Sequence, residues 1–200
     1  METRTSAKCR PATLIVLAGG SSRRMKRIKA VMPAQDKPLI QHVLDQVKSL
    51  FDEVLISVSR GQKFEFLPYP MVEDAAEGIG PMAGILSGLK AAAHDTCLVL
   101  ACDIPDVDPA FLVKLLDEAS GYEIVVPLSG EKKYEPLLAV YKKSVIPKIE
   151  SLISAGDFSI LSLFPKCRTR TLAMPDTPWI RNLNTPEDYE NWIKQNKAKG

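Results

Sequence analysis

Short apolar runs alternate with amphipathic stretches along this chain, and the alternation limits the folds that it can adopt. Each apolar run has the length of a strand and is far too short to span a membrane. The stretches between them carry apolar residues at helical spacing. We expect strands at Thr13–Ala18, Glu53–Val58, Met71–Asp74, Cys97–Cys102, Glu123–Leu128 and Leu137–Tyr141. We expect helices at Pro38–Leu50, Pro81–Ala93, Asp108–Ser120 and Val145–Ala155, and a last one that opens at Thr185.

Strands separated by helices predict an α/β fold with a doubly wound, mainly parallel sheet and helices on both faces. The chain shows no internal repeat and no linker, so we expect a loose tail over residues 1–12 and a single domain over residues 13–196. Ligands of such folds bind beyond the carboxyl ends of the strands. Chemistry is therefore to be sought in the residues that follow each strand.

The composition excludes several classes of function. Lys and Arg number 26 against 24 Asp and Glu, a net charge of +2 that gives no reason to expect nucleic acid or a membrane surface as a partner. The first residues contain no apolar stretch typical of a secretory signal. The four cysteines form no Cys-x-x-Cys pair, and two of them lie in an apolar strand as buried thiols would. We expect a cytoplasmic protein.

The first strand ends in a loop suited to a polyphosphate. Gly19 and Gly20 permit a sharp turn and a close backbone approach, and Ser21 and Ser22 add hydroxyl donors. Five cations and no acid then fall within Arg23–Lys29. The loop has neither the Gly-Lys-Ser/Thr of a P-loop nor Gly-x-Gly-x-x-Gly. A solvated basic loop is the alternative interpretation.

Two carboxylates follow strands in the same way. Asp103 comes directly after the apolar strand Leu98–Cys102, where it can hold Mg²⁺ together with substrate phosphates, or simply cap the next turn. Asp74 ends the third strand, and the glycines of Gly78–Gly84 open the next helix. The only histidines, His42 and His94, fall in predicted helices away from the strand ends. The pattern favours phosphoryl or nucleotidyl transfer, which needs positioning, cations and a metal.

Together these motifs resemble the nucleotidyltransferases with a Leu-Ala-Gly-Gly loop, and within them the molybdenum cofactor guanylyltransferases of the MobA type. The resemblance runs from Thr13 to Trp192. It rests on LAGGSSRRM (17–25) with Lys29, KPLI (37–40), VED (72–74), GPMAG (80–84), CDIP (102–105), EPLLAVY (135–141) and NLNTPEDY (182–189).

The resemblance implies a role for each matching residue. Lys29 and Arg24 would hold the triphosphate of GTP, and Asp103 would bind Mg²⁺ and act with them in catalysis. Asn182, Asn184 and Glu135 would lie near the pterin-bearing substrate. The implied nucleotide contacts are Leu17, Ala18, Gly19, Gly20, Ser21, Lys29, Ser57, Asp74, Gly80, Pro81, Gly84 and Asp103.

Three positions depart from the family pattern. Ser57 stands where an Asn is common and can donate one hydrogen bond without replacing an amide. Lys26 and Ile28 stand where the family usually has Gly and Asp, so the loop is expected to follow a different path. The cytidylyltransferases tend to have Asp-x-Asp at the C-terminal motif, and Asn182 and Asn184 therefore favour guanosine.

The implied reaction joins GMP from GTP to molybdopterin and releases pyrophosphate. Other cofactor-biosynthesis proteins and the molybdoenzymes that receive the product are further expected partners. The alternatives are a cytidylyltransferase for the same pterin, a sugar-phosphate nucleotidyltransferase, and a catalytically silent nucleotide-binding protein.

Overall fold

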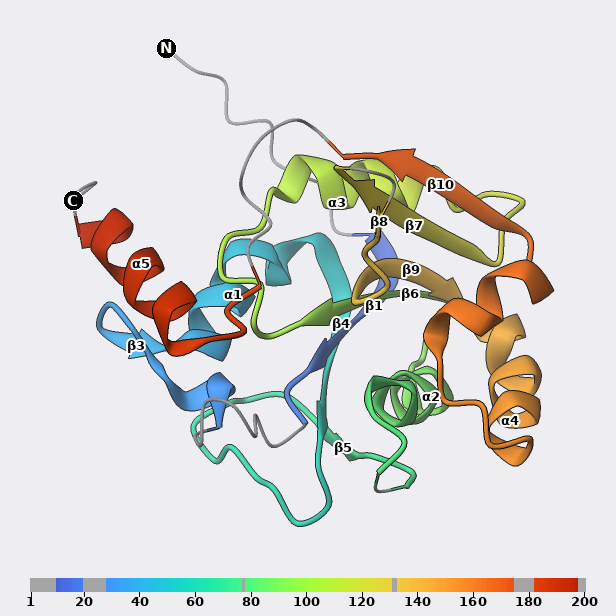
Figure 1. Cartoon of the computed structure of the whole chain (residues 1–200), viewed down its shortest axis with the longest axis horizontal. Coiled ribbons are helices and arrows are strands. Elements are labelled where there is room, and N and C mark those ends of the chain that lie inside the picture. Colours follow the sequence, from blue (N-terminus) through green and yellow to red (C-terminus); the bar gives the residue numbers. More distant parts are fainter. Residues whose placement is uncertain (1–9, 20–27, 77, 131–132, 175–181, 198–200) are drawn as a thin grey trace.

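A sheet of eight strands forms the centre of the molecule (Figure 1). The computed structural model describes residues 10–19, 28–76, 78–130, 133–174 and 182–197. The strand order is β10-β7-β9-β6-β1-β4-β5, and β8 pairs with β7. The strands are β1 (Arg10–Leu17), β4 (Phe51–Val58), β5 (Met71–Glu73), β6 (Thr96–Ala101), β7 (Ile124–Ser129), β8 (Lys133–Tyr134), β9 (Leu138–Lys142) and β10 (Thr169–Ala173). Within the described sheet only β8 and β9 run against the others, so the expectation of a mainly parallel α/β fold is confirmed.

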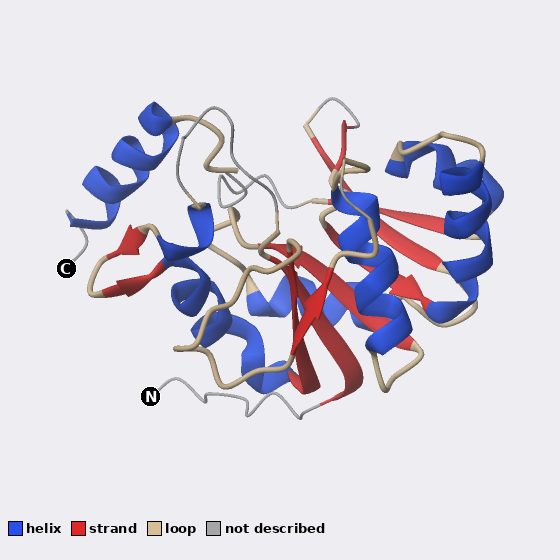
Figure 2. Ribbon diagram, turned by 90° about the horizontal axis from the view of Figure 1, so that it is seen from below, coloured by secondary structure: helices blue, strands red, loops and turns tan. Residues whose placement is uncertain are grey.

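Helices cover both faces of the sheet (Figures 1 and 2). On one face lie α1 (Leu39–Val47) and α3 (Pro109–Asp117). On the other lie α2 (Pro81–Ala91), α4 (Ile146–Ser154) and the 3₁₀ segment Ile160–Lys166. Shorter 3₁₀ turns occupy Lys29–Val31, Lys48–Leu50 and Lys143–Val145.

The central strands β1 and β6 are mostly apolar because both of their sides are covered. Along β1, Leu14 and Val16 pack toward α1 and α3, whereas Ile15 and Leu17 pack toward α2. The same alternation holds along β6, from Cys97 to Leu100. Successive side chains of a strand point to opposite faces, so a strand buried on both faces needs apolar side chains at most positions. Buried Thr13 of β1 donates a hydrogen bond to Glu53.

The register of the parallel strands brings their carboxyl ends together. Leu17, the last residue of β1, is paired with Ser57 in β4 and with Ala101 in β6. Val58, the last residue of β4, is paired with Glu73, the last residue of β5. The segments that leave these four strands therefore start at one edge of the sheet.

The last helix packs away from the sheet. Helix α5 (Pro186–Lys197) lies beside the two-residue strands β2 (Pro33–Ala34) and β3 (Lys37–Pro38) at one end of the molecule (Figure 2). Buried Leu183 and Trp192 form a small separate core there with Ala34 and Leu39. This core holds the C-terminal segment near the carboxyl edge of the sheet.

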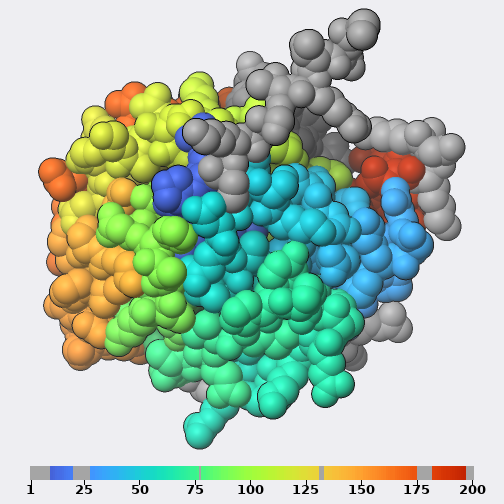
Figure 3. Space-filling view, turned by 180° about the vertical axis from the view of Figure 1, so that it is seen from behind, coloured from blue at the N-terminus to red at the C-terminus, as the bar shows by residue number. Residues whose placement is uncertain are grey.

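The connection between β4 and β5 is a long loop with its own anchors. Phe64 and Leu67 of this loop are buried in the core beside α1. Seen from behind, the segment after β4 forms the lower part of the surface in blue-green (Figure 3). The two buried side chains fix the start of the loop, Ser59 and Arg60, beside the carboxyl edge.

The predicted elements differ from the structure mainly at their ends. Strand β1 begins at Arg10, within the expected tail, and the helix predicted over 38–50 ends at Val47 and continues as a 3₁₀ turn. The sequence reading missed β2, β3, β8 and β10. His94 lies in a turn after α2, not in a helix. No helix in the described ranges combines the length and the apolar character needed to cross a bilayer.

The contact between α2 and β1 yields a test of packing. A Cβ at Gly88 would lie 2.6 Å from Cγ2 of Ile15, which is fully buried. Alanine gains about 1 kcal/mol over glycine in helix propensity, but overpacking of a core costs about 1–3 kcal/mol. We expect Gly88→Ala to lower the free energy of unfolding in urea titrations. In an Ile15→Ala background the same change should be neutral or stabilising, and a stabilised single variant would contradict the packing.

Candidate functional site

A cavity of about 640 Å³ opens where the carboxyl ends of β1, β4, β5 and β6 meet. This volume is typical of small-molecule sites. It is lined by Leu17, Ala18, Gly19, Lys29, Ser57, Ser59, Arg60, Asp74, Ala76, Gly78, Gly80, Pro81, Gly84, Ala101, Cys102, Asp103 and Leu137. Most of the residues singled out from the sequence therefore share one site, although strands far apart in the chain carry them.

Asp74 is held between two glycines. A Cβ at Gly19 would lie 2.8 Å from Oδ2 of Asp74, and a Cβ at Gly84 would lie 3.1 Å from Oδ1. Ser57 donates a hydrogen bond of 2.7 Å to the same Oδ1. Burial raises the pKa of Asp74, and the Ser57 hydroxyl opposes this in part. Gly19 is thus required by the close approach of the Asp74 carboxylate, which follows β5, and Gly84 by the still closer approach of the Ser57 hydroxyl.

The turn after β1 is tied to β4 through a single carbonyl group. The N–H groups of Ala18 and Gly19 both donate to the backbone oxygen of Ser57, at 2.8 and 3.0 Å. These two N–H groups are therefore occupied, and a ligand meets other atoms of the turn. The Ser57 hydroxyl points to Asp74, so its one hydrogen bond stays within the protein.

Lys29 connects three segments of the chain. Its Nζ donates to Oδ2 of Asp103 at 2.8 Å and to Oδ1 of Asn184 at 3.3 Å. The side chains of Lys29 and Asp103 are only 16% and 20% exposed, so their ion pair is partly shielded from water. The pair brings a cation and a carboxylate to the cavity wall, as the sequence predicted for both residues.

The second wall of the cavity is the start of α2. Gly80 is the N-cap with φ of +66°, a left-handed conformation that favours glycine, and Pro81 follows in the first turn. Gly78 is also left-handed. The glycines of this segment thus shape the backbone that borders the cavity.

The oxygen groups of the cavity suit a hard cation completed by a ligand. Among the described residues, no three His, Cys, Asp or Glu side chains gather to hold a metal by themselves. Asp103 offers one carboxylate, which is enough for Mg²⁺ when phosphates and water supply the other ligands. Neighbouring Cys102 is unsuited to ligation, because burial raises the pKa of its thiol to about 12 and keeps it protonated. The donor set therefore fits Mg²⁺ better than Zn²⁺.

The three residues expected near the second substrate lie in different surroundings. Asn184 is exposed and contacts Lys29, whereas Oδ1 of Asn182 is buried without a hydrogen-bond partner among the described residues. Glu135 is buried and accepts a hydrogen bond of 2.6 Å from Ser129. Glu135 does not line the cavity, although Leu137, two residues on, does.

Some predicted residues cannot be placed, and the sequence reading missed others. Gly20, Ser21, Arg24 and Lys26 lie outside the described residues. Ile28 is described and is 44% exposed. The sequence reading missed Ser59, Arg60, Ala76, Cys102 and Leu137 as lining residues. The rule that ligands bind after strand ends could have found Ser59 and Arg60, because they directly follow β4.

Sequence comparisons place the chain among nucleotidyltransferases. The sequence profile of the MobA-like NTP transferase domain matches residues 14–170. The probable molybdenum cofactor guanylyltransferase of Carboxydothermus hydrogenoformans is 31% identical over 190 residues, which cover 91% of this chain and 95% of that protein. The molybdenum cofactor guanylyltransferase of Pseudomonas fluorescens is 36% identical over 184 residues, covering 88% and 91%.

A solved structure agrees with these relatives. Molybdopterin-guanine dinucleotide biosynthesis protein A from Archaeoglobus fulgidus superposes with a TM-score of 0.79 and 25% sequence identity. The match covers 94% of this chain and 100% of that one. The profile match spans most of the sheet and the walls of the cavity. On the sequence profile, the relatives and the fold together, the chain belongs to the MobA-like NTP transferase family.

Proposed function

We propose that the protein transfers GMP from GTP to molybdopterin and so forms a guanine dinucleotide cofactor and pyrophosphate. The observation that carries the proposal is the joint presence of the Lys29–Asp103 pair and the glycine-flanked Asp74 in one cavity. Lys29 can meet phosphates directly, Asp103 can meet them through a metal ion, and Asp74 can meet a nucleoside. The printed names of the relatives support the choice of substrates.

The reaction requires positioning more than proton transfer. A phosphate oxygen of the acceptor attacks the α-phosphorus of GTP, the bond from that phosphorus to the bridging oxygen breaks, and pyrophosphate leaves with the electron pair. The attacking oxygen is already anionic, so no general base is needed. The described cavity wall accordingly contains no histidine. Its task is to hold two polyanions in line, and Lys29 offsets their repulsion.

Asp103 is the residue that would hold Mg²⁺. When bound, the metal would supply positive charge beside the phosphates and stabilise the charge that develops on them. Lys29 also neutralises the charge of the Asp103 carboxylate, to which its ammonium group donates a hydrogen bond. Entry of the triphosphate would give the ammonium group a stronger set of acceptors.

Asp74 is our candidate for the nucleoside side of the cavity. Its Oδ1 is occupied by Ser57, and Oδ2 lies against the turn at Gly19. An ionised carboxylate only accepts hydrogen bonds, and guanine presents an amino group that donates them. The pocket thus offers an acceptor where a guanine could donate.

The acceptor side is assigned by the same proposal to Asn182, Asn184 and Glu135, with Gly20, Ser21 and Arg24 completing the phosphate site. Molybdopterin would be the second substrate, and cofactor-biosynthesis proteins and molybdoenzymes are the proposed protein partners. We further propose that the protein acts in the cytoplasm.

Nucleotide choice is the most direct test of the proposed function. With Mg²⁺ present, GTP should bind more tightly than CTP or ATP in titration calorimetry, because only guanine matches the acceptor at Asp74 with its amino and ring N–H groups. Pyrophosphate release with each nucleotide, with and without molybdopterin, is the companion measurement. Equal or stronger binding of CTP would reject the guanylyl assignment. Pyrophosphate release with a sugar phosphate but not with molybdopterin would reject the proposed reaction. Absence of release with every acceptor tested would also reject it.

Asp103→Asn tests the metal ligand. The amide keeps the shape and can still accept from Lys29, so thermal stability should change little. The charge that retains Mg²⁺ is lost, and turnover should fall on the order of a thousandfold. The measurement is the rate of pyrophosphate release against Mg²⁺ concentration for both proteins. Near-normal turnover with an unchanged Mg²⁺ dependence would show that Asp103 is only part of a turn.

Asp74→Asn should separate stability from binding. Because burial raises the pKa of Asp74, the folded chain keeps this proton to higher pH than the unfolded chain, and stability falls as pH rises between the two values. At pH 7 the ionised carboxylate therefore costs stability. The neutral amide, which can still accept from Ser57, should raise the Tm and flatten its dependence on pH above 4. GTP affinity should fall by roughly ten- to hundredfold. A lower Tm combined with unchanged affinity would contradict both parts.

A further inference from the structure

The C-terminal segment reaches the cavity through a reciprocal cap at the start of α5. Oδ2 of Asp188 accepts hydrogen bonds from the backbone N–H groups of Asn184, at 3.0 Å, and Thr185, at 2.8 Å. In return, Oγ1 of Thr185 accepts from the N–H of Asp188 at 3.1 Å. Such a pair of bonds fixes the backbone where the chain enters a helix. Oδ2 of Asp188 thus fixes the backbone at Asn184 together with the backbone oxygen of Asn182, which accepts from the same N–H at 2.9 Å.

The side chain of Asn184 links the capped backbone to Lys29. Its side-chain oxygen accepts from Nζ of Lys29 at 3.3 Å, and Asp103 takes a second bond from the same nitrogen. A lysine ammonium is a mobile charge on a four-carbon stem, so partners on two sides are needed to hold it in one place. The amide oxygen is neutral and orients the ammonium group without cancelling its charge, whereas Asp103 cancels it.

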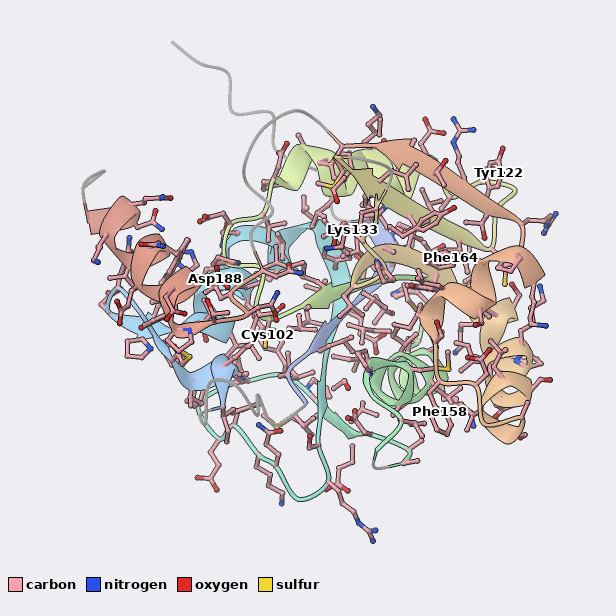
Figure 4. The ribbon with its side chains drawn as sticks, in the orientation of Figure 1. Cys102, Tyr122, Lys133, Phe158, Phe164 and Asp188 are labelled. Carbon is pink, nitrogen blue, oxygen red and sulfur yellow. The ribbon has the colours of Figure 1, made fainter. Side chains whose placement is uncertain are left out.

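Helix α5 is anchored by contacts that do not involve the cap. Nε1 of Trp192, a buried residue, donates to Oδ2 of Asp106 at 2.8 Å, and the Tyr189 hydroxyl donates to the backbone oxygen of Pro33 at 2.5 Å. The N–H of Leu183 donates to the backbone oxygen of Asp103 at 2.9 Å. Loss of the cap would therefore loosen the backbone at Asn184, which keeps its bond to the Asn182 carbonyl, while the helix stays in place. Figure 4 shows Asp188 in the first turn of α5, on the side of the end of β6 marked by Cys102.

We propose that Asp188 is a positioning residue: it helps to fix Asn184 so that the Asn184 amide directs the Lys29 ammonium group between the triphosphate of GTP and the phosphate of the acceptor substrate. The inference rests on the proposed function, because it assigns a role within the transfer reaction. Asp188 itself does not line the cavity. The pKa of Asp188 is lowered mainly by the backbone N–H of Thr185, with the charge of Lys29 as a smaller cause, as expected for the ionised carboxylate of the cap.

Asp188→Ala should slow the reaction more than it weakens binding. The variant removes the two hydrogen bonds that Oδ2 of Asp188 accepts and keeps the backbone bond to Thr185. A misplacement of a catalytic group by about 1 Å commonly slows a reaction by ten- to hundredfold, which is the loss of kcat that we expect. The Kd of GTP should change by less than about threefold, because Lys29 keeps its charge and its bond to Asp103 and loses only the orienting contact with Asn184. Asp188→Asn keeps an acceptor oxygen in place and should restore most of the turnover.

A double-mutant cycle distinguishes positioning from simple stabilisation. If Asp188 acts through Asn184, the double variant Asp188→Ala/Asn184→Ala should turn over no more slowly than Asn184→Ala alone. The matched control is Asp108→Ala, which removes the N-cap of α3, where Asp108 accepts from the N–H of Ala110 at 2.9 Å. Both cap losses should lower the Tm by about 2–4 °C, but only the one at Asp188 should lower kcat.

The outcomes separate the inference from the function on which it rests. A wild-type protein that makes no dinucleotide from GTP and molybdopterin overturns the proposed function and the role of Asp188 with it. An active wild type with additive effects in the cycle overturns the inference alone. An Asp188→Asn variant as slow as Asp188→Ala, or an Asp108→Ala variant equally slow, does the same.

Discussion

The parallel register of β1 with its two neighbours determines where everything else in the site can lie. Leu17 is paired with Ser57 on one side and with Ala101 on the other, so three strands end at the same level. The chain must leave all three there, and its polar backbone and side chains collect at that edge. A slip of one residue would exchange the two buried faces of β1 and would also separate Gly19 from Asp74.

The two carboxylates of the cavity wall, Asp74 and Asp103, have different electrostatic surroundings. Asp103 is compensated by the ammonium group of Lys29, whereas among the described residues the side chain of Asp74 has only the neutral Ser57 hydroxyl as a hydrogen-bond partner, and burial raises its pKa. A carboxylate held without a countercharge is a ready acceptor for an uncharged donor, and a paired one is ready to exchange its partner for a cation. In the proposed function, one aspartate can thus bind a nucleobase and another can bind a metal ion within the same cavity.

The sequence sufficed for features that depend on neighbours in the chain. The runs in β1 and β6 could be recognised because strands buried on both faces are mostly apolar, and Asp103 because it follows such a run. Strand β10 could not, since it is an edge strand with a single buried residue, Leu172, and no apolar run. The reason for Gly19 could not be seen in the sequence either, because the carboxylate that occupies the space of its missing side chain comes from Asp74, which follows another strand. The sequence reading gave the acidic first turn of α5 to the helix alone, and its bond to Asn184 emerged only in three dimensions.

The order in which the chain is made bears on when the site is complete. The strands, the glycine turn and Lys29 all precede residue 174, but the second partner of Lys29 comes from the segment that leads into α5. Domains form as their segments emerge from the ribosome, from the N-terminal end onward. The sheet and its cavity can therefore assemble while the chain is still tethered, and the lysine receives its final orientation only when the last helix docks.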